Sequence, residues 1–248
     1  MRTQIMLSAV TVMAVSLLAA DAKEEVKGAA KKLADASGYS WKMTTEMGTA
    51  AGGGGGAGAG RMRPGPTEGK AIKDGTICVT MTRGDTTTEV YKQGEKGAVK
   101  TPEGWQSFAE MAESGGGGGG QGGRGNYMTR MFRNFKAPAA QAVDIVEKTQ
   151  GLKKEADAYV GELTAEGVKS LMMMGGRPGG QGPEIADPKG SVKFWMKDGV
   201  LTKYEYRVSG KMTFNNNERD MDRTVKVEIK DVGTTKIEMP AEAKKKLS

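Results

Sequence analysis

The sequence predicts an α+β protein in which a curved antiparallel β-sheet, an unclosed half-barrel, packs on helices. Long segments towards both ends of the chain alternate apolar and polar residues, which is typical of strands with one covered and one solvated face. Between them, apolar residues recur with the period of short helices, which must cover the apolar face of the sheet. Three glycine-rich inserts, near 51–66, 114–125 and 175–184, interrupt this pattern, and we expect them to be disordered.

Residues 1–22 are a predicted signal peptide. Arg2 precedes an apolar run over 5–20, and the tripeptide Ala-Asp-Ala at 20–22 is a small-x-small cleavage motif. The run is short for a membrane span, and no cysteine directly follows it at the cleavage motif. We therefore expect a periplasmic or extracellular protein that is cleaved near Ala22, is not lipid-anchored, and forms a single half-barrel domain over 23–248.

The composition excludes several classes of site. The chain has no histidine, which removes histidine-based triads, histidine general bases and nearly all catalytic zinc sites. Cys78 is the only cysteine, so no intrachain disulfide can form. Three acids within 218–222 lie on one side of a predicted strand and are weak calcium candidates, but interleaved arginines favour a charge-balanced turn. We predict no enzyme activity, no cofactor and no metal site.

The N-terminal half predicts one helix and then a meander. Val26, Ala29 and Leu33 share a helical face, and period-two alternation then predicts a strand over 39–47. Further strands follow up to about residue 97, with turns at Lys73-Asp74-Gly75 and at 83–85. The Arg-Gly-Asp triplet at 83–85 is interpreted as a turn and not as an integrin ligand, because Gly-Asp strongly favours turns.

The middle of the chain predicts short helices. They lie over 105–112, over 128–135, from Pro138, and from Thr164, which is a plausible N-cap; a strand is expected over 156–160. Because arginines flank the apolar stripe of 128–135, a basic amphipathic helix on an anionic membrane surface is an alternative to a packed helix.

The C-terminal part has the clearest alternation. It predicts strands over 192–197, 202–208, 225–229 and 237–239, with a second Lys-Asp-Gly turn at 197–199. A basic tail follows Pro240.

These segments resemble the lipoprotein-carrier fold of the periplasmic Lol type and the related mycobacterial lipid-binding lipoproteins. The resemblance lies in "YSWKMTTEM", "GTICVTMTRGDTTTEVYKQGEKG", the tryptophan of "TPEGWQSF", "LTAEGVKSLM", "SVKFWMKDGVLTKYEYRV" and "VEIKDVGTTKIEMP". It covers most of the mature chain outside the inserts. It implies a half-barrel plugged by helices, with acyl chains or other apolar molecules bound between sheet and helices. The inserts and the missing lipoprotein cysteine depart from the family pattern.

Seven large apolar residues are candidates for the lining of such a pocket: Trp41, Met43, Met81, Trp105, Phe194, Met196 and Tyr204. The alternative is that they form an ordinary core, because such a sheet must bury one face. The 17 methionines of the sequence, with a run of three at 172–174, favour a pocket, since flexible thioethers adapt to variable apolar ligands.

We therefore predict an exported, non-catalytic monomer that binds a lipid or acyl-chain ligand between sheet and helices. The alternative is an envelope structural or interaction module with a filled core, whose glycine-rich loops contact an envelope protein or a membrane surface. A continuous cavity beneath the strands at 41–43 and 194–196 distinguishes the two. Nucleic acid is not an expected partner, because the Arg/Gly stretches are weak motifs and export removes the protein from cytoplasmic RNA.

Overall fold

The structure, a computed structural model, describes residues 6–48, 65–84, 86–114, 129–173, 184–214 and 217–247, and side chains of the first helix from Asp21 onwards. Its strands are β1 (Gly38–Met47), β2 (Thr67–Ile72), β3 (Thr76–Arg83), β4 (Thr86–Gln93), β5 (Lys96–Thr101), β6 (Gly104–Ser107), β7 (Thr149–Glu155), β8 (Ala158–Leu163), β9 (Glu184–Lys197), β10 (Val200–Phe214) and β11 (Asn217–Lys230). Its helices are α1 (Met6–Asp35), α2 (Phe108–Ser114), α4 (Pro138–Glu147), α5 (Ala165–Met172) and α6 (Ala241–Leu247), with a further helical turn at 129–133.

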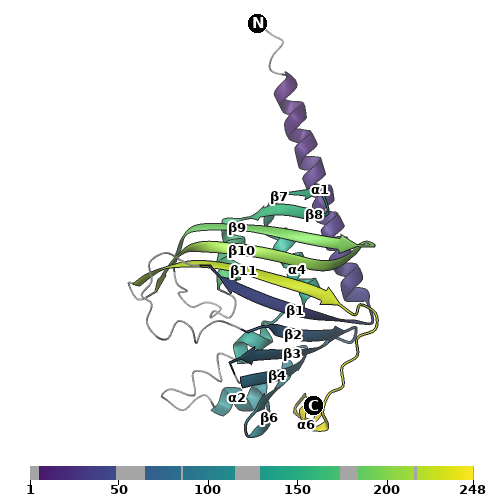
Figure 1. The fold of residues 1–248 in the computed structure, drawn as a ribbon, viewed down its shortest axis with the longest axis vertical. Coiled ribbons are helices and arrows are strands. Elements are labelled where there is room, and N and C mark those ends of the chain that lie inside the picture. The colour runs from purple at the N-terminus through teal and green to yellow at the C-terminus, as the bar shows by residue number, and fades with distance from the viewer. Residues whose placement is uncertain are drawn as a thin grey trace.

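The strands form one 11-stranded antiparallel sheet in the order β6-β5-β4-β3-β2-β1-β11-β10-β9-β8-β7 (Figure 1). The first and last strands of the chain meet in the middle, where the ladder of β1 and β11 runs from the pair Ser40–Lys230 to the pair Met47–Arg223. β6 and β7 form the two edges, so the sheet is not closed. The predicted α+β half-barrel is thereby confirmed.

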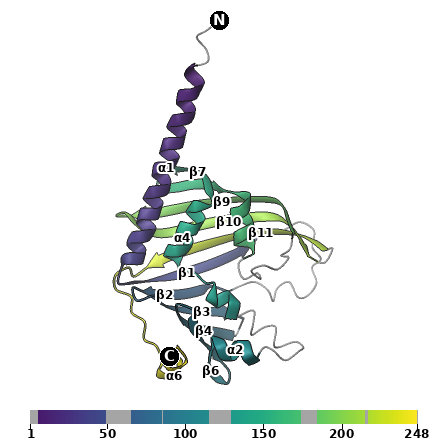
Figure 2. The same cartoon turned by 180° about the vertical axis from the view of Figure 1, so that it is seen from behind.

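Most helices cover one face of the sheet, which we call the inner face (Figure 2). α1 contacts β7, β9 and β10 and also packs on α4, while α5 contacts β8, β9 and β10. α6 instead contacts β4, β5 and β6, and its residues Ala243 and Leu247 belong to a separate apolar cluster on the opposite, outer face. Helices thus plug the inner face, and a single C-terminal helix covers one part of the outer face.

Aromatic residues anchor the helix layer to the sheet. α4 begins at Pro138 without a side-chain cap of its own, and the hydroxyl of Tyr39 on β1 accepts a hydrogen bond from the Ala139 N–H at 3.3 Å. The Tyr159 hydroxyl of β8 donates to Glu25 of α1. Both helices are therefore held to the sheet by polar contacts at its apolar face, and at α4 the contact satisfies an N-terminal N–H that has no intrahelical partner.

Several predicted elements are confirmed by their local chemistry. The Thr164 hydroxyl caps α5 by accepting from the Gly167 N–H at 3.1 Å. The turns at 73–75 and 197–199 place Gly75 and Gly199 at φ 85° and 72°, where a side chain is unfavourable. Asp74 accepts from the Thr76 N–H at 2.8 Å, which stabilises the first of these turns.

Two predictions in the middle of the chain give the right kind of element with the wrong bounds. The helix expected over 105–112 begins only at Phe108, because Ser107 and Glu110 form a capping box there: each side chain accepts from the other residue's N–H, at 3.1 and 2.7 Å. Trp105 consequently belongs to β6. The single strand expected over 156–160 is one half of the β7–β8 hairpin, with Ala156 in its turn at φ 52°.

The strand expected over 237–239 is wrong. Residues 231–240 form no strand; Ile237 and Met239 pack against the outer-face cluster, and α6 follows. The alternation of apolar residues therefore has another cause: an extended segment crosses the outer face and turns every second side chain towards it.

α1 is continuous through the predicted cleavage site, and Ala22 is buried in the core. None of the described helices is long and apolar enough to cross a membrane. The three predicted inserts fall almost entirely outside the described residues.

Candidate functional site

The centre of the inner face is filled by large side chains. Phe194 and Tyr204 are fully buried, and Trp41 is 3% exposed. The Tyr204 hydroxyl donates to the Gln141 side-chain oxygen of α4, and the Trp41 ring stacks on Phe135 at a centroid distance of 6.2 Å. Helix and sheet therefore interlock where the sequence predicted a ligand.

The register places four of the seven predicted lining residues in one row across the sheet. Directly paired positions of adjacent strands point to the same face, so the side chains of a row are neighbours. The row runs from β3 to β8 through Met81, Thr67, Met43, Val227, Tyr204, Phe194 and Tyr159.

The other three predicted residues lie apart from this row. Trp41 packs in the inner core two positions before Met43, and Met196 packs on the same core near the β9–β10 turn. Trp105 lies on the outer face, where its ring centroid is 5.5 Å from that of Tyr91. The structure thus brings six of the seven to the inner face and separates Trp105 from them.

One end of the inner face carries three methionines that we call the methionine shelf: Met47, Met212 and Met221. They lie on the adjacent strands β1, β11 and β10; Met47 pairs with Arg223, and Met221 pairs with Gly210, two positions before Met212. Met212 and Met221 are half-buried against the core, and Met47 is 48% exposed. Apolar packing therefore gives way to a partly exposed thioether surface at this end.

An arginine lies within the shelf. Arg223 is half-buried on the inner face, and its Nη2 donates to the Leu171 carbonyl at the end of α5 at 2.6 Å. Its Nε is buried and has no hydrogen-bond partner among the described residues. Burial raises the pKa of the neighbouring Tyr206 hydroxyl, and the positive charge of Arg223 opposes that rise. The shelf thus combines apolar surface with an incompletely bonded cation.

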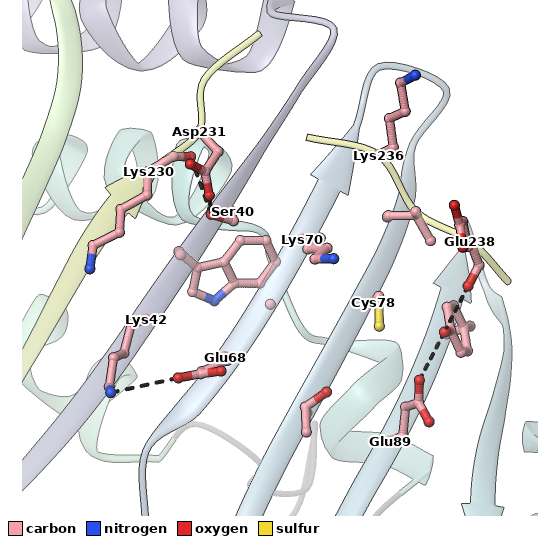
Figure 3. Close-up of a pocket in the computed structure, with 15 residues that line it drawn as sticks. Ser40, Lys42, Glu68, Lys70, Cys78, Glu89, Lys230, Asp231, Lys236 and Glu238 are labelled. Atoms are coloured by element: carbon pink, nitrogen blue, oxygen red, sulfur yellow. Dashed lines mark hydrogen bonds and ion pairs between the residues drawn. The ribbon is translucent and has the colours of Figure 1, made fainter. Parts of the chain in front are cut away.

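The outer face carries a half-open groove of about 720 Å³ (Figure 3). Polar side chains of β1 to β4 form its floor, and the segment that follows β11 forms one wall. Lys42 and Glu68 pair at 3.6 Å, and the Ser40 hydroxyl donates to Asp231 at 2.7 Å. Eight residues of both charge signs line the groove: Lys42, Glu68, Lys70, Glu89, Lys230, Asp231, Lys236 and Glu238.

Tyr91 and Cys78 close the groove beside the C-terminal segment. The Tyr91 hydroxyl lies 2.8 Å from a Glu89 carboxylate oxygen and 3.2 Å from the Glu238 carbonyl oxygen, so both acceptors share its proton. Burial and the Glu89 carboxylate raise the pKa of Tyr91, and burial is also the main cause of the raised pKa of the Cys78 thiol. The thiol is therefore protonated and a weak nucleophile at neutral pH.

The acids considered for calcium do not converge. Asp222 forms a two-point contact with the Arg207 guanidinium, with distances of 2.9 and 2.6 Å, which lowers the pKa of the carboxyl. Among the described residues, no group of three or more Cys, Asp or Glu side chains is placed to hold a metal ion.

No protein-family model matches the sequence, and no curated protein is similar to it. The fold is similar to two solved mycobacterial structures. LprF from Mycobacterium bovis is 10% identical, with a TM-score of 0.45 over 90% of this chain and 97% of that one. The lipoprotein LppX from Mycobacterium tuberculosis is also 10% identical, with a TM-score of 0.45 over 88% of this chain and 97% of that one.

Sequence reasoning missed the outer groove and Arg223. The groove needs the pairing of β1 with β11 and the course of 231–240, neither of which the alternation reveals. Arg223 was considered only as a counter-charge to its acidic neighbours. The available signal was the strict alternation within 218–223, which sends the arginines to one face and the acids to the other.

Proposed function

We propose that the protein is an exported, non-catalytic binding protein that holds an apolar, acyl-chain-like ligand on the methionine shelf. The observation that carries this proposal is the change along the inner face. Its centre is packed with fully buried aromatic rings, whereas at one end Met212 and Met221 are half-buried and Met47 is 48% exposed. The shelf is therefore the part of the inner face that still has apolar surface to offer.

Physical chemistry favours an apolar ligand there. Covering apolar surface is worth about 25 cal/mol per Å² removed from water. Methionine side chains are flexible and polarisable, so they adapt to chains of different length and shape. The ligand lies at the edge of the space between sheet and helices, because the Trp41–Phe135 stack and the Tyr204–Gln141 contact occupy the centre.

The test measures the affinity of Met47→Gln protein for oleyl alcohol, a neutral ligand. The affinity is obtained from the displacement of a bound fluorescent acyl probe. We expect binding about fivefold weaker than in the wild type, since a partly exposed methionine contributes a fraction of the roughly 1.5–3 kcal/mol of a fully buried one. Val232→Gln is the matched control: among the residues that the structure describes, Val232 is the other exposed large apolar residue, 38% exposed, in the turn that follows β11.

We expect Val232→Gln to bind oleyl alcohol like the wild type. Native mass spectrometry of protein purified from the periplasm should also detect a co-purifying lipid. Wild-type protein that binds neither the probe nor oleyl alcohol and carries no lipid would contradict the proposal.

The outer groove favours a second candidate function, an envelope interaction module with a filled core. A half-open cavity of about 720 Å³ with interspersed charges is suited to a polar partner and not to an acyl chain. Cys78 is the only cysteine of the chain and lines the groove, so a photo-crosslinker can be attached there alone. This candidate requires crosslinking to an envelope protein from position 78 but not from a Cys78→Ser, Lys193→Cys control, because Lys193 is exposed on the outer face and lies outside the groove.

A further inference from the structure

We infer that the ligand of the methionine shelf carries an anionic head, a carboxylate or a phosphate, which Arg223 receives while the chain of the ligand lies on the shelf. The inference rests on the proposed function and specifies the class of ligand. Three observations carry it: the sorting of charges along β11, the hydrogen bonding of Arg223, and the contact between the arginine and the apolar shelf.

The N-terminal half of β11 separates its charges by face. Successive side chains of a strand point to opposite sides, so Arg219, Met221 and Arg223 face inwards, and Asp222 faces outwards, where it pairs with Arg207 at 2.6 Å. Glu218 and Asp220 share that outward face. Neither inward arginine forms an ion pair with a described carboxylate. This end of the inner face is therefore cationic, although the strand carries as many acids as bases.

The Arg223 guanidinium has a buried N–H donor without an acceptor in the described part of the chain, which is energetically unfavourable. The Leu171 carbonyl engages Nη2, while the buried Nε has no partner among the described residues. A buried donor without an acceptor loses its hydration without compensation. A guanidinium offers its N–H groups in a planar fork that fits the two oxygens of a carboxylate or phosphate. An anionic head thus supplies both the missing acceptor and the missing counter-charge.

The surroundings of Arg223 select an amphiphile over a small hydrophilic anion. Met47 is its direct partner on β1, and Met221 lies two positions away on the same face of β11. An anion with an acyl chain covers these thioethers and neutralises the arginine together. A free phosphate satisfies only the arginine and leaves the apolar surface exposed to water.

The experiment compares oleate and oleoyl lysophosphatidate with oleyl alcohol, which has the same chain without the charge, in binding to the full chain. We expect the wild type to prefer both anions about tenfold or more, and Arg223→Gln to remove this preference while oleyl alcohol binding stays within about twofold. Arg223→Lys should retain part of it, because it keeps the charge and loses the fork. Arg207→Gln, an arginine on the opposite face, is the matched control and should leave all three affinities unchanged.

The outcomes separate this inference from the proposed function. If wild-type protein binds oleyl alcohol as tightly as oleate, or if Arg223→Gln keeps the full preference, the anionic head is refuted and the acyl-chain site stands. If the wild type binds none of the three, the proposed function itself fails. Should Arg223→Gln lack a cooperative thermal transition, the wild-type preference and its reduction in Arg223→Lys decide the question.

Discussion

The two faces of this sheet are built from the same strands and have opposite chemistry. On β3, Val79 and Met81 face the helices, while Cys78 and Thr80 face the groove. The inner face is occupied by rings and aliphatic side chains that interlock with α1, α4 and α5. The outer face is crossed by the extended segment 231–240, which leaves a polar groove beside it. Alternation along each strand is thus sufficient to give one sheet two kinds of surface.

Among the described residues, the open cavity of this molecule is the polar groove on the outer face, and not the apolar centre of the inner face. The inner centre excludes water because it is full, and the polar groove is open because few side chains cover it. An apolar ligand therefore has access to the inner face only at its margin, where the methionine shelf is half-exposed. In this half-barrel, the buried apolar side chains and the surface open to an apolar ligand are therefore at different places.

The largest expected effect is on the free energy of unfolding, and it compares two adjacent residues of β9 that face opposite sides of the sheet. Phe194 is fully buried on the inner face, and Lys193 is exposed on the outer face. We expect Phe194→Ala to lower the free energy of unfolding by about 3–5 kcal/mol and Lys193→Ala to change it by less than about 0.5 kcal/mol, both measured by urea denaturation. A cost for Phe194→Ala below about 1.5 kcal/mol would mean that the centre already contains a cavity into which the neighbours relax.

The strands could be predicted because alternation and turn chemistry are local. The segments at 39–47 and 192–208, and both Lys-Asp-Gly turns, show their structure within a few residues of sequence. The face of Trp105 could not be predicted, because it depends on a capping box that delays α2 to Phe108 and leaves the tryptophan on an edge strand. The local sequence pattern predicts the type of element, whereas the Ser107–Glu110 capping box determines the face to which Trp105 points.

Long-range pairing accounts for the rest of what the sequence does not reveal. The shelf assembles from strands β1, β10 and β11, and the residues of its central pair, Met47 and Arg223, are far apart in the chain. The methionine content indicated adaptable apolar surface but not its place. The filled centre likewise depends on the Trp41–Phe135 stack and the Tyr204–Gln141 bond, which join segments whose packing no periodicity reveals.

A middle-sized effect tests whether the outer face is held independently of the inner one. Tyr91→Phe removes the hydroxyl shared by Glu89 and the Glu238 carbonyl, which we expect to cost about 1 kcal/mol and to loosen the segment over Cys78. The thiol should then react several times faster with a disulfide reagent, because relief of burial, the largest cause of its raised pKa, outweighs loss of the Tyr91 hydrogen bond, which lowers that pKa. Tyr204→Phe loses a hydroxyl on the inner face and should leave the thiol rate unchanged. An equal rise in both variants would show that the faces open together.

The smallest effect concerns the carboxyl of Glu110, through which α6 is paired with α2. The Lys246 ammonium donates to Glu110 at 2.5 Å, and this contact, with help from the Ser107 N–H, lowers the pKa of Glu110 from 4.5 to about 2. Because the pKa is lower in the folded state, the stabilisation is present above pH 4.5 and is lost as the pH falls towards 2. We expect carbon-detected NMR titration to give a pKa near 2 in the wild type and a value closer to 4.5 in Lys246→Met. The Asp222 carboxyl, held by Arg207 elsewhere on the outer face, should titrate identically in both proteins. A normal pKa for Glu110 in the wild type would mean that α6 does not stay on the sheet in solution, and the outer face would then be open from the groove to β6.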